Sequence, residues 1–287
     1  MPGAGRLTSM LVECVVNVSE GRDQAVLDEL AASAAAVLLD LHADPHHHRS
    51  VFTLAGVVDD IMDAVRGLAA LSVAHLDLRT HEGAHPRLGV LDVVPFIPFV
   101  PGQPPSHDLG TVVPLRNELA EWLGTTLAVP SFLYGPLPGG GDRTLPQVRR
   151  YAFTGIDPDF GPAHPHCTAG ATAVGARPAL VAYNVWVSSV RVARHVAPLV
   201  RGPMVRALGL AVGDRAQVSC NLVDPAHLGP AQIYDLVADC VAGVGGTVLG
   251  AELVGLIPQS ILTDIGTDRW TQLGLSADST LESRLLL

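Results

Sequence analysis

The stretch GVLDVVPFIP, Gly89 to Pro98, is a nearly continuous apolar run and predicts a buried β-strand. Toward the N-terminus, similar runs alternate with amphipathic segments whose apolar residues recur at three- and four-residue steps, as in helices. The resulting order is βαββαβ, the split-βαβ or ferredoxin-like unit. Ser19 is expected to cap the first helix. The strands are expected at residues 11–18, 36–43, 49–56 and 89–98, and the helices at 19–36 and 59–76.

A second βαββαβ order follows later in the chain. It ends, like the first, in the dipeptide Ile-Pro, here at residues 257–258. We therefore predict an α/β (α+β) fold of two ferredoxin-like subdomains, residues 1–176 and 177–287, whose sheets face each other across a cleft. The second set of strands is expected at 179–187, 205–212, 216–224 and 247–258, with helices at 190–202 and 230–243.

The segment that joins the two units has a different character. A helix at residues 115–127 and a strand at 129–135 come first. From Gly135 to Gly175 the chain is rich in glycine and proline and poor in periodic apolar residues. This composition predicts a connection made of long loops, which are often where binding groups lie.

The composition is that of a compact globular protein with an acidic surface. Of the 287 residues, 48% are hydrophobic and 16% are charged, and the formal net charge is −10. Such a surface repels nucleic acid and anionic membranes, so neither is an expected partner, and an anionic ligand would need a local pocket of arginines. All 18 basic residues are arginine, and the absence of lysine excludes Walker-A and Schiff-base lysine sites.

Neither the N-terminus nor the cysteines indicate export. The first ten residues lack the apolar core of a signal peptide, and no apolar run is long enough to span a bilayer. The four cysteines are scattered without a C-x-x-C pair, which indicates reduced thiols in a cytoplasmic protein. Cys14 and Cys220 fall in apolar strands and are expected to be buried and inert.

Directly before the strand at 89–98 lies HEGAH, residues 81–85, which matches the H-E-x-x-H pattern of zinc metalloproteases. That pattern depends on a helix that sets both histidines on one face. Gly83 weakens a helix, and Pro86 pushes the residue before it toward extended geometry. We therefore expect His85 at a turn leading into the strand, where it serves acid–base catalysis or the structure alone. Arg87 would grip a carboxylate or lie on the surface.

Four histidines gather around the turn between the second and third strands, at positions 42, 46, 47 and 48. On an extended segment His46 and His48 would share a face and could bind a metal. A metal site needs more convergent ligands than this stretch offers, and a solvated polar turn is the simpler interpretation. We therefore predict no metal.

Two segments, VECVVNVSEGR at 12–22 and HPRLGVLDVVPFIP at 85–98, resemble the glutamate formimidoyltransferase family. The resemblance continues in order through RSVFTLAG, VPSFLYG, PDFGP, GATAVGAR, AQVSCNLVD and AELVGLIP, so it covers nearly the whole chain. In animals this folate-dependent transferase is fused to a cyclodeaminase. The sequence ends soon after AELVGLIP, so the resemblance implies the transferase part without a cyclodeaminase domain.

The resemblance implies two α/β subdomains with a folate-binding cleft between them, in a homodimer. It implies transfer of the formimino group from N-formimino-L-glutamate to N5 of tetrahydrofolate, within histidine degradation and one-carbon metabolism. Tetrahydrofolate is the implied co-substrate, without a metal. The family's catalytic histidine falls on His85. Its folate-contacting loop falls on Gly161, Pro162, Ala163, His164, Pro165, His166, Cys167, Thr168, Ala169 and Gly170.

One histidine suffices for this reaction. The N5 amine loses a proton as it attacks the formimino carbon, and the departing glutamate nitrogen gains one, so one imidazole can act as base and then as acid. Both substrates carry carboxylates, for which Arg49, Arg87 and Arg177 are candidate ligands. Arg177 is equally a candidate for a salt bridge that joins the subdomains. Asp40, expected to close the second strand, is a candidate to orient His85 or to polarise the formimino nitrogen.

The sequence also departs from the family pattern. Where the animal enzymes carry an aspartate two residues after Asp40, this chain has His42, itself a candidate substrate ligand, and HRS at 48–50 replaces their N-R-T. The folate loop contains two histidines and no aromatic residue, and Cys167 in it is a lining residue or a nucleophile. Three alternatives therefore stay open: a formylglutamate–tetrahydrofolate formyltransferase, a folate-binding protein without turnover, and a metal-dependent hydrolase that uses the histidines.

Overall fold

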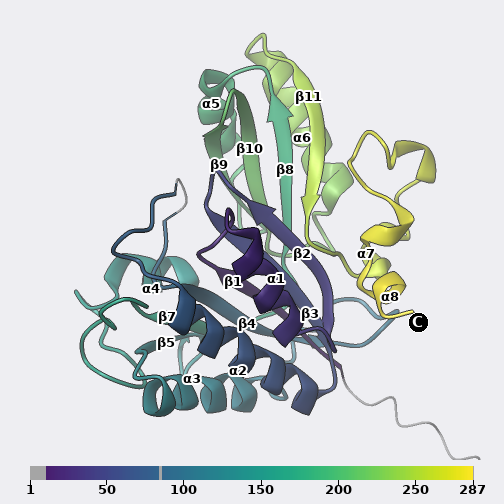
Figure 1. The fold of residues 1–287 in the computed structure, drawn as a ribbon. Helices are drawn as coiled ribbons and strands as arrows, with labels where there is room; N and C mark the ends of the chain where they lie inside the picture. Colours follow the sequence, from purple (N-terminus) through teal and green to yellow (C-terminus); the bar gives the residue numbers. More distant parts are fainter. Residues whose placement is uncertain (1–10, 84–85, 287) are drawn as a thin grey trace, which may run out of the picture.

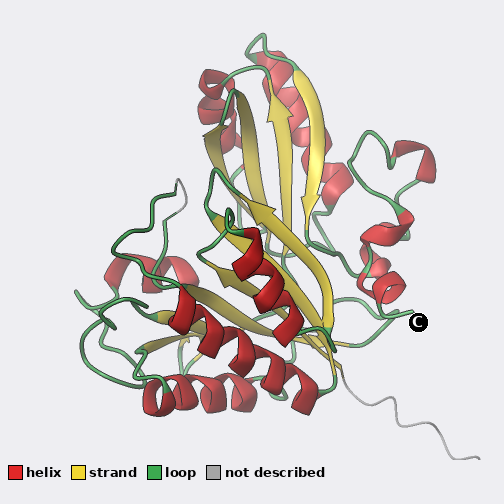
Figure 2. Ribbon diagram, viewed as in Figure 1, coloured by secondary structure: helices red, strands yellow, loops and turns green. Residues whose placement is uncertain are grey.

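The computed structural model describes residues 11–83 and 86–286 of the chain. Its strands form two sheets on which helices pack (Figures 1 and 2). The first sheet has seven strands in the order β2-β3-β1-β4-β7-β5-β6. These strands are β1 Leu11–Val18, β2 Leu38–Asp44, β3 Arg49–Gly56, β4 Leu91–Phe99, β5 Ser131–Pro136, β6 Asp142–Arg143 and β7 Thr172–Ala176.

Four neighbouring strands of this sheet, β2-β3-β1-β4, confirm the predicted ferredoxin-like arrangement. β1 lies antiparallel between β3 and β4, with Cys14 opposite Leu54 on one side and Phe96 on the other. The remaining strands extend the sheet beyond the prediction, because β7 pairs in parallel with both β4 and β5, and β6 follows β5. The first subdomain is thus a ferredoxin-like unit enlarged by three strands.

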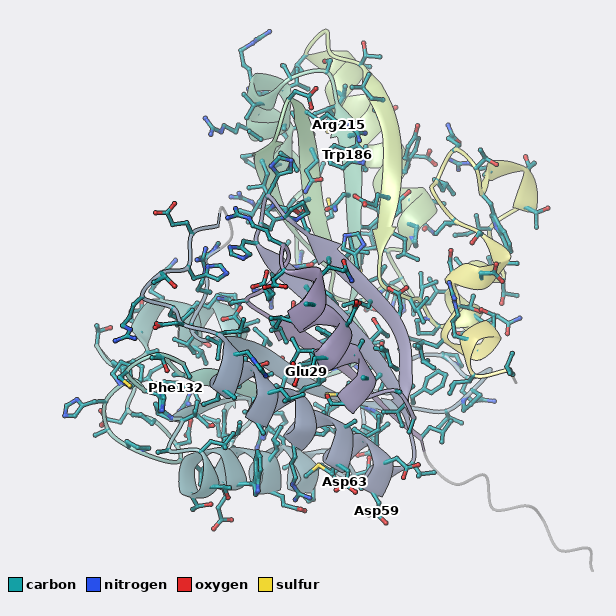
Figure 3. The ribbon with its side chains drawn as sticks, in the orientation of Figure 1. Glu29, Asp59, Asp63, Phe132, Trp186 and Arg215 are labelled. Carbon is teal, nitrogen blue, oxygen red and sulfur yellow. The ribbon has the colours of Figure 1, made fainter. Side chains whose placement is uncertain are left out.

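The second sheet repeats this topology without an extension. Its order, β11-β8-β10-β9, again places the first strand of the unit between the fourth and the third. On the face away from the helices, the Arg215 guanidinium lies 3.8 Å from the centroid of the Trp186 ring (Figure 3). The strands are β8 Val181–Val187, β9 Val205–Val212, β10 Arg215–Leu222 and β11 Val248–Val254.

Helices cover the sheet faces that carry apolar side chains at alternate strand positions. Val12, Cys14 and Val16 of β1 are fully buried in one core with Leu30 of α1 and Leu68 of α2. In the described part of the chain, no helix combines the length and apolarity needed to cross a membrane. The helices are α1 Gln24–Ser33, α2 Val58–His75, α3 Val113–Thr126, α4 Leu145–Tyr151, α5 Val190–Val200, α6 Pro230–Gly243, α7 Gln259–Leu262 and α8 Leu281–Arg284.

The first helix begins later than the sequence predicts. α1 starts at Gln24, and its N-cap is Asp23, whose carboxylate accepts two amides of the first turn. Ser19 instead donates its hydroxyl to Gly89 O at 2.8 Å, so it ties the end of β1 to the residues before β4. The prediction that Ser19 caps the helix is therefore wrong.

The Gly- and Pro-rich segment between Gly135 and Gly175 contains more regular structure than the loops predicted for it. Thr144 caps α4 in a capping box with Gln147. Residues Thr172–Ala176 form β7, which lies between β4 and β5. Its residues are small because side chains of the neighbouring strand approach closely: a methyl group at Gly175 would lie 2.0 Å from the ring of Tyr134 in β5. Small residues give no periodic apolar signal, which is why the sequence does not reveal this strand.

The helix layers lie on opposite sides of the molecule, with α1 and α2 in front of the first sheet and α5 and α6 behind the second (Figure 1). The helix-free faces are therefore turned toward each other, as predicted. The two subdomains come close at two glycines of the second one, where an added side chain would meet the first. A methyl group at Gly255 would lie 3.1 Å from Thr53 Oγ1, and one at Gly213 would lie 3.0 Å from His46 Nε2.

The two sheets divide the chain between β7, which ends at Ala176, and β8, which begins at Val181. Leu256 and Leu281 from the C-terminal part pack with Phe99 of β4, so an apolar contact also connects the two subdomains. The domain boundary after residue 176, and the use of the intervening face for folate, stay predictions.

Candidate functional site

The helix-free face of the first sheet carries three predicted site residues. Asp40 and His42 of β2 lie opposite Thr53 and Val51 of β3, and strand alternation puts them on the face away from α1 and α2. Arg49, two residues before Val51, shares that face. Asp40 lies within β2, so the expectation that it closes the strand is wrong. Burial raises the pKa of the Asp40 carboxyl.

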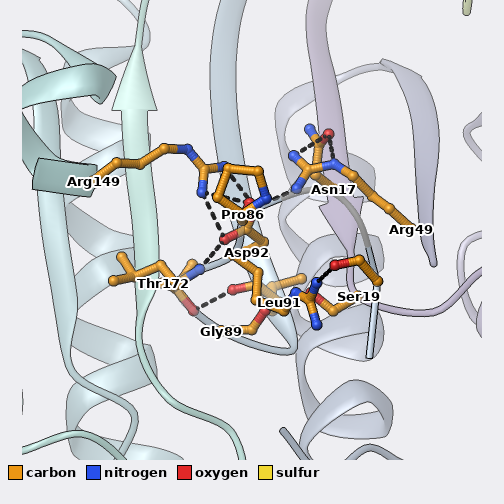
Figure 4. Close-up of polar contacts among 12 residues, drawn as sticks. Asn17, Ser19, Arg49, Pro86, Gly89, Leu91, Asp92, Arg149 and Thr172 are labelled. Carbon is orange, nitrogen blue, oxygen red and sulfur yellow. Dashed lines mark hydrogen bonds and ion pairs between the residues drawn. The ribbon is translucent and has the colours of Figure 1, made fainter. Parts of the chain in front are cut away.

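A buried carboxylate, Asp92, holds two arginines at one end of this face (Figure 4). Asp92 is fully buried, and its Oδ2 accepts hydrogen bonds from Arg49 Nη1 and, at 2.7 Å, from Arg149 Nη2. Arg49 also donates from Nε and Nη2 to Asn17 Oδ1, at 3.0 and 2.6 Å. Burial acts to raise the pKa of Asp92, but the two guanidinium groups bring it down to about 2. Two arginines therefore converge on one carboxylate, which neutralises one of their two charges.

The turn between β2 and β3 contacts the HEGAH segment. His48, whose φ is +50°, stacks on His81 with the ring centroids 3.9 Å apart. Its Nδ1 lies 2.9 Å from Glu82 O and its Nε2 lies 3.1 Å from Glu20 Oε1. Burial, and then the charges of His48 and Arg87, lower the pKa of His81. His81 is thus a neutral ring packed under the turn.

Arg87 folds back over the HEGAH segment. Its Nη2 donates to Gly83 O at 2.5 Å and its Nη1 donates to His81 O at 3.2 Å. Residues 81–83 are not helical, as predicted, so the geometry of a zinc protease motif is lost. His85, the predicted catalytic residue, lies outside the described residues.

The predicted folate loop, residues 161–170, pairs with both flanks of the HEGAH segment. Leu78 N donates to Thr168 O at 2.8 Å, and Val90 N donates to Ala169 O at 2.9 Å. His166 Nδ1 accepts a hydrogen bond from the Ala169 amide at 3.1 Å, which closes a turn at the end of the loop. Ala169 and Gly170 are buried, and His166 and Thr168 are half-buried. The exposed members are Gly161, Pro162, Ala163, His164, Pro165 and Cys167.

Arg177 lies at the other end of the sheet. Its amide donates to Phe96 O at 3.1 Å. Phe96 is four residues beyond Asp92 on β4, which separates the two positions by roughly 13 Å at 3.3 Å per residue. The structure therefore does not bring Arg177 into the group around Arg49. The acidic neighbour of Arg177 is the buried Glu13 of β1.

The histidines at 46–48 do not converge. The stretch forms a turn, in which His47 pairs with Asp44 at 2.7 Å and His48 with Glu20. The idea that His46 and His48 share a face of an extended segment is therefore wrong. Within residues 11–83 and 86–286, no three His, Cys, Asp or Glu side chains gather in a way that could hold a metal ion.

The cysteines differ in burial. Cys14 and Cys220 are buried, as predicted, and burial raises the pKa of both thiols, to about 12 for Cys220. Cys167 is exposed on the folate loop. The two core thiols are thus kept protonated and unreactive.

Three residues of the cluster around Arg49 are absent from the predicted set: Asn17, Asp92 and Arg149. Asp92 has a signal in the sequence, because a lone charge inside an apolar strand must be paired once the strand is buried. For Arg149 the signal is the T-x-x-Q capping box at 144–147, which predicts the helix that presents it. Asn17 has no such signal, since an asparagine at the end of a strand is common.

The family model and the similar proteins indicate the same family. Residues 11–177 match the family described as "Formiminotransferase domain, N-terminal subdomain". The glutamate formimidoyltransferase of Streptococcus pyogenes serotype M1 is 35% identical over 89% of this chain and 91% of its own length. That of Thermoplasma acidophilum is 30% identical over 96% and 97%. The formimidoyltransferase-cyclodeaminase of Sus scrofa is 33% identical over 89% of this chain, which spans only 52% of that longer protein.

Proposed function

This chain belongs to the formiminotransferase family, and from that premise we propose that it transfers the formimino group of N-formimino-L-glutamate to N5 of tetrahydrofolate. Family membership and the named relatives make the chain a transferase. The donor, the co-substrate and the catalytic histidine belong to the proposal.

One structural observation supports the proposal most strongly. The loop at 161–170, expected to contact folate, is hydrogen-bonded to Leu78 and Val90, which flank the segment that contains His85. Asp40, His42 and Arg49 lie on the adjoining helix-free face. In this proposal an acceptor held by the loop meets a donor held on this face, which is the arrangement that a direct transfer between two bound substrates needs.

The proposed step needs one group that exchanges protons. The N5 lone pair attacks the formimino carbon, a carbon–nitrogen bond forms, and His85 takes the proton that N5 loses. The imidazolium then gives a proton to the glutamate nitrogen, the original carbon–nitrogen bond breaks, and glutamate leaves. His85 ends as it began, ready for another turnover.

The arginines divide into two groups in this proposal. Arg49 lies on the same face as Asp40 and His42, with its guanidinium on Asp92 and Asn17, and its place on that face makes it the candidate for a substrate carboxylate. The guanidinium groups of Arg87 and Arg177 make backbone contacts with Gly83 and Pro178. Asp40 lies on the same face and is the candidate partner for the formimino nitrogen, because a carboxylate can pair with a cationic amidine.

The proposal is tested by His85→Ala, measured by the transfer of the formimino group to tetrahydrofolate. The variant is expected to lose at least about 100-fold in kcat, because general acid–base catalysis contributes this much or more. Tetrahydrofolate affinity should change little. His107→Ala, on an exposed loop, is the matched control and should retain full activity.

Two results would count against this account. Unchanged turnover in His85→Ala would remove the histidine from the mechanism. A wild-type protein that binds tetrahydrofolate and never turns over would favour the folate-binding alternative.

A further inference from the structure

β4 contains a β-bulge at Asp92. The register of β1 against β4 shifts between Asn17 and Val18, which leaves Asp92 as the extra residue. A bulge re-aims the side chain it inserts, and bulges are frequent beside active sites. This one directs a carboxylate into the interior, where it meets Arg49 and Arg149.

Asp92 and Arg149 also hold the backbone that follows His85. Arg149 Nη1 donates to Pro86 O at 3.1 Å while its Nη2 binds Asp92 Oδ2 at 2.7 Å (Figure 4). Leu88 N donates to Asp92 Oδ1 at 2.6 Å. One guanidinium thus links helix α4, a buried carboxylate and the residue next to His85 in the chain.

We propose that Arg149 is a positioning residue for the transfer reaction: anchored on Asp92, it fixes the backbone of residues 86–88, which directly follow the proposed catalytic residue His85 in the chain. This inference rests on the proposed role of His85. The geometry requires arginine, because a planar guanidinium offers separate donors to a carboxylate and a carbonyl, whereas an ammonium is a compact point charge.

A direct substrate contact would have a different signature. Displacing the backbone near a catalytic group by about 1 Å lowers turnover about 100-fold and leaves substrate binding largely intact. Losing a carboxylate ligand would instead raise KM. The split between kcat and KM therefore separates a positioning role from a binding role.

The test compares Arg149→Met, which keeps the length of the side chain and removes its donors, with Arg150→Met. Arg150 is the exposed neighbour on the same helix, 5.9 Å from the centroid of the Tyr151 ring. We expect Arg149→Met to lower kcat by about 10- to 100-fold, with KM for tetrahydrofolate within about threefold of the wild type. Arg150→Met should match the wild type, and Arg149→Lys should recover part of the loss.

A second readout does not depend on catalysis. Amide hydrogen exchange of the peptide that contains Leu88 should be at least about 10-fold faster in Arg149→Met. The reason is that Asp92, which accepts the hydrogen bond of the Leu88 amide, loses its contact with Arg149. Arg150→Met should leave this exchange unchanged. The two measurements separate the two proposals. A wild-type protein without activity refutes the proposed function, while unchanged hydrogen exchange at Leu88 in Arg149→Met refutes the positioning role of Arg149.

Three outcomes would overturn the proposal: a raised KM with kcat retained, an equal loss of kcat in Arg150→Met, or normal exchange at Leu88 in Arg149→Met. Should Arg149→Met fail to fold, Arg149→Lys takes its place in both measurements. Normal kcat together with normal exchange in that variant would equally contradict the proposal.

Discussion

At the scale of single residues, Glu13 is the most unusual carboxyl group in the molecule. It lies on the helix-free face of β1 and is only 4% exposed. Burial raises its pKa to about 7, with Arg177 acting against the shift and Glu282 adding to it. Between pH 4.5 and about 7, the folded protein therefore keeps Glu13 mainly protonated, whereas the unfolded chain ionises it.

This shift predicts a pH-dependent cost. The unfolded carboxyl ionises near pH 4.5 and the folded one near 7, so the wild type loses stability as the pH rises through this window. Glu13→Gln removes the titration, and its stability relative to the wild type should improve by about 2 kcal/mol between pH 5 and pH 8. Urea unfolding at both pH values measures this. Glu121→Gln, an exposed control, should show no such trend, and a relative loss for Glu13→Gln at pH 8 would contradict the assignment.

Only part of the site can be predicted at this scale. Asp40, His42 and Arg49 are predictable as residues of one face, because alternation along paired strands puts them there. Asp92 is different, because a bulge redirects it and no periodic pattern marks a bulge. Arg149 comes from a helix in a Gly-rich connection, more than fifty residues from the strand it contacts.

At the scale of elements, the contact between the loop at 161–170 and the residues that flank HEGAH depends on close backbone packing. Gly170 has φ +71°, and a methyl group on it would lie 2.5 Å from Leu88 O. Gly102 has nearly the same φ, +72°, with nothing within 4 Å of an added methyl group. The two glycines separate the cost of the backbone conformation from the cost of crowding.

Gly102→Ala should cost about 1–2 kcal/mol, the penalty for a side chain in the left-handed region. Gly170→Ala should cost at least about 2 kcal/mol more, because the loop must move away from Leu88. The free energy of unfolding in urea measures both. Equal losses of stability in Gly102→Ala and Gly170→Ala would show that the loop at 161–170 does not pack closely against Leu88.

Elements with a strong periodic signal are predictable, and those without one are not. β1, β3, α2 and α6 lie within a few residues of their predicted ranges. β7 escapes prediction because it consists of small residues that let Tyr134 pack above Gly175. α4 escapes because one short amphipathic turn within a Gly-rich stretch is outweighed by its surroundings, although its capping box is readable.

At the scale of the whole molecule, two sheets share one strand order and face each other, and the first carries two arginines paired with Asp92 in an otherwise acidic protein. The duplication is predictable because each half repeats its pattern of strands and helices. The pairing of the loop at 161–170 with the residues that flank HEGAH is not predictable, because contacts between loops distant in sequence leave no local pattern.

The central claim is that this chain transfers a formimino group to tetrahydrofolate. The most direct test incubates the purified protein with tetrahydrofolate and either N-formimino-L-glutamate or N-formyl-L-glutamate, and follows the folate product spectrophotometrically. We expect formiminoglutamate to be consumed in equal amount to the product formed, with kcat/KM at least about 10-fold above that for the formyl donor, since only the amidine is cationic and can pair with Asp40. Preference for formylglutamate, or no transfer from either donor, would contradict the account.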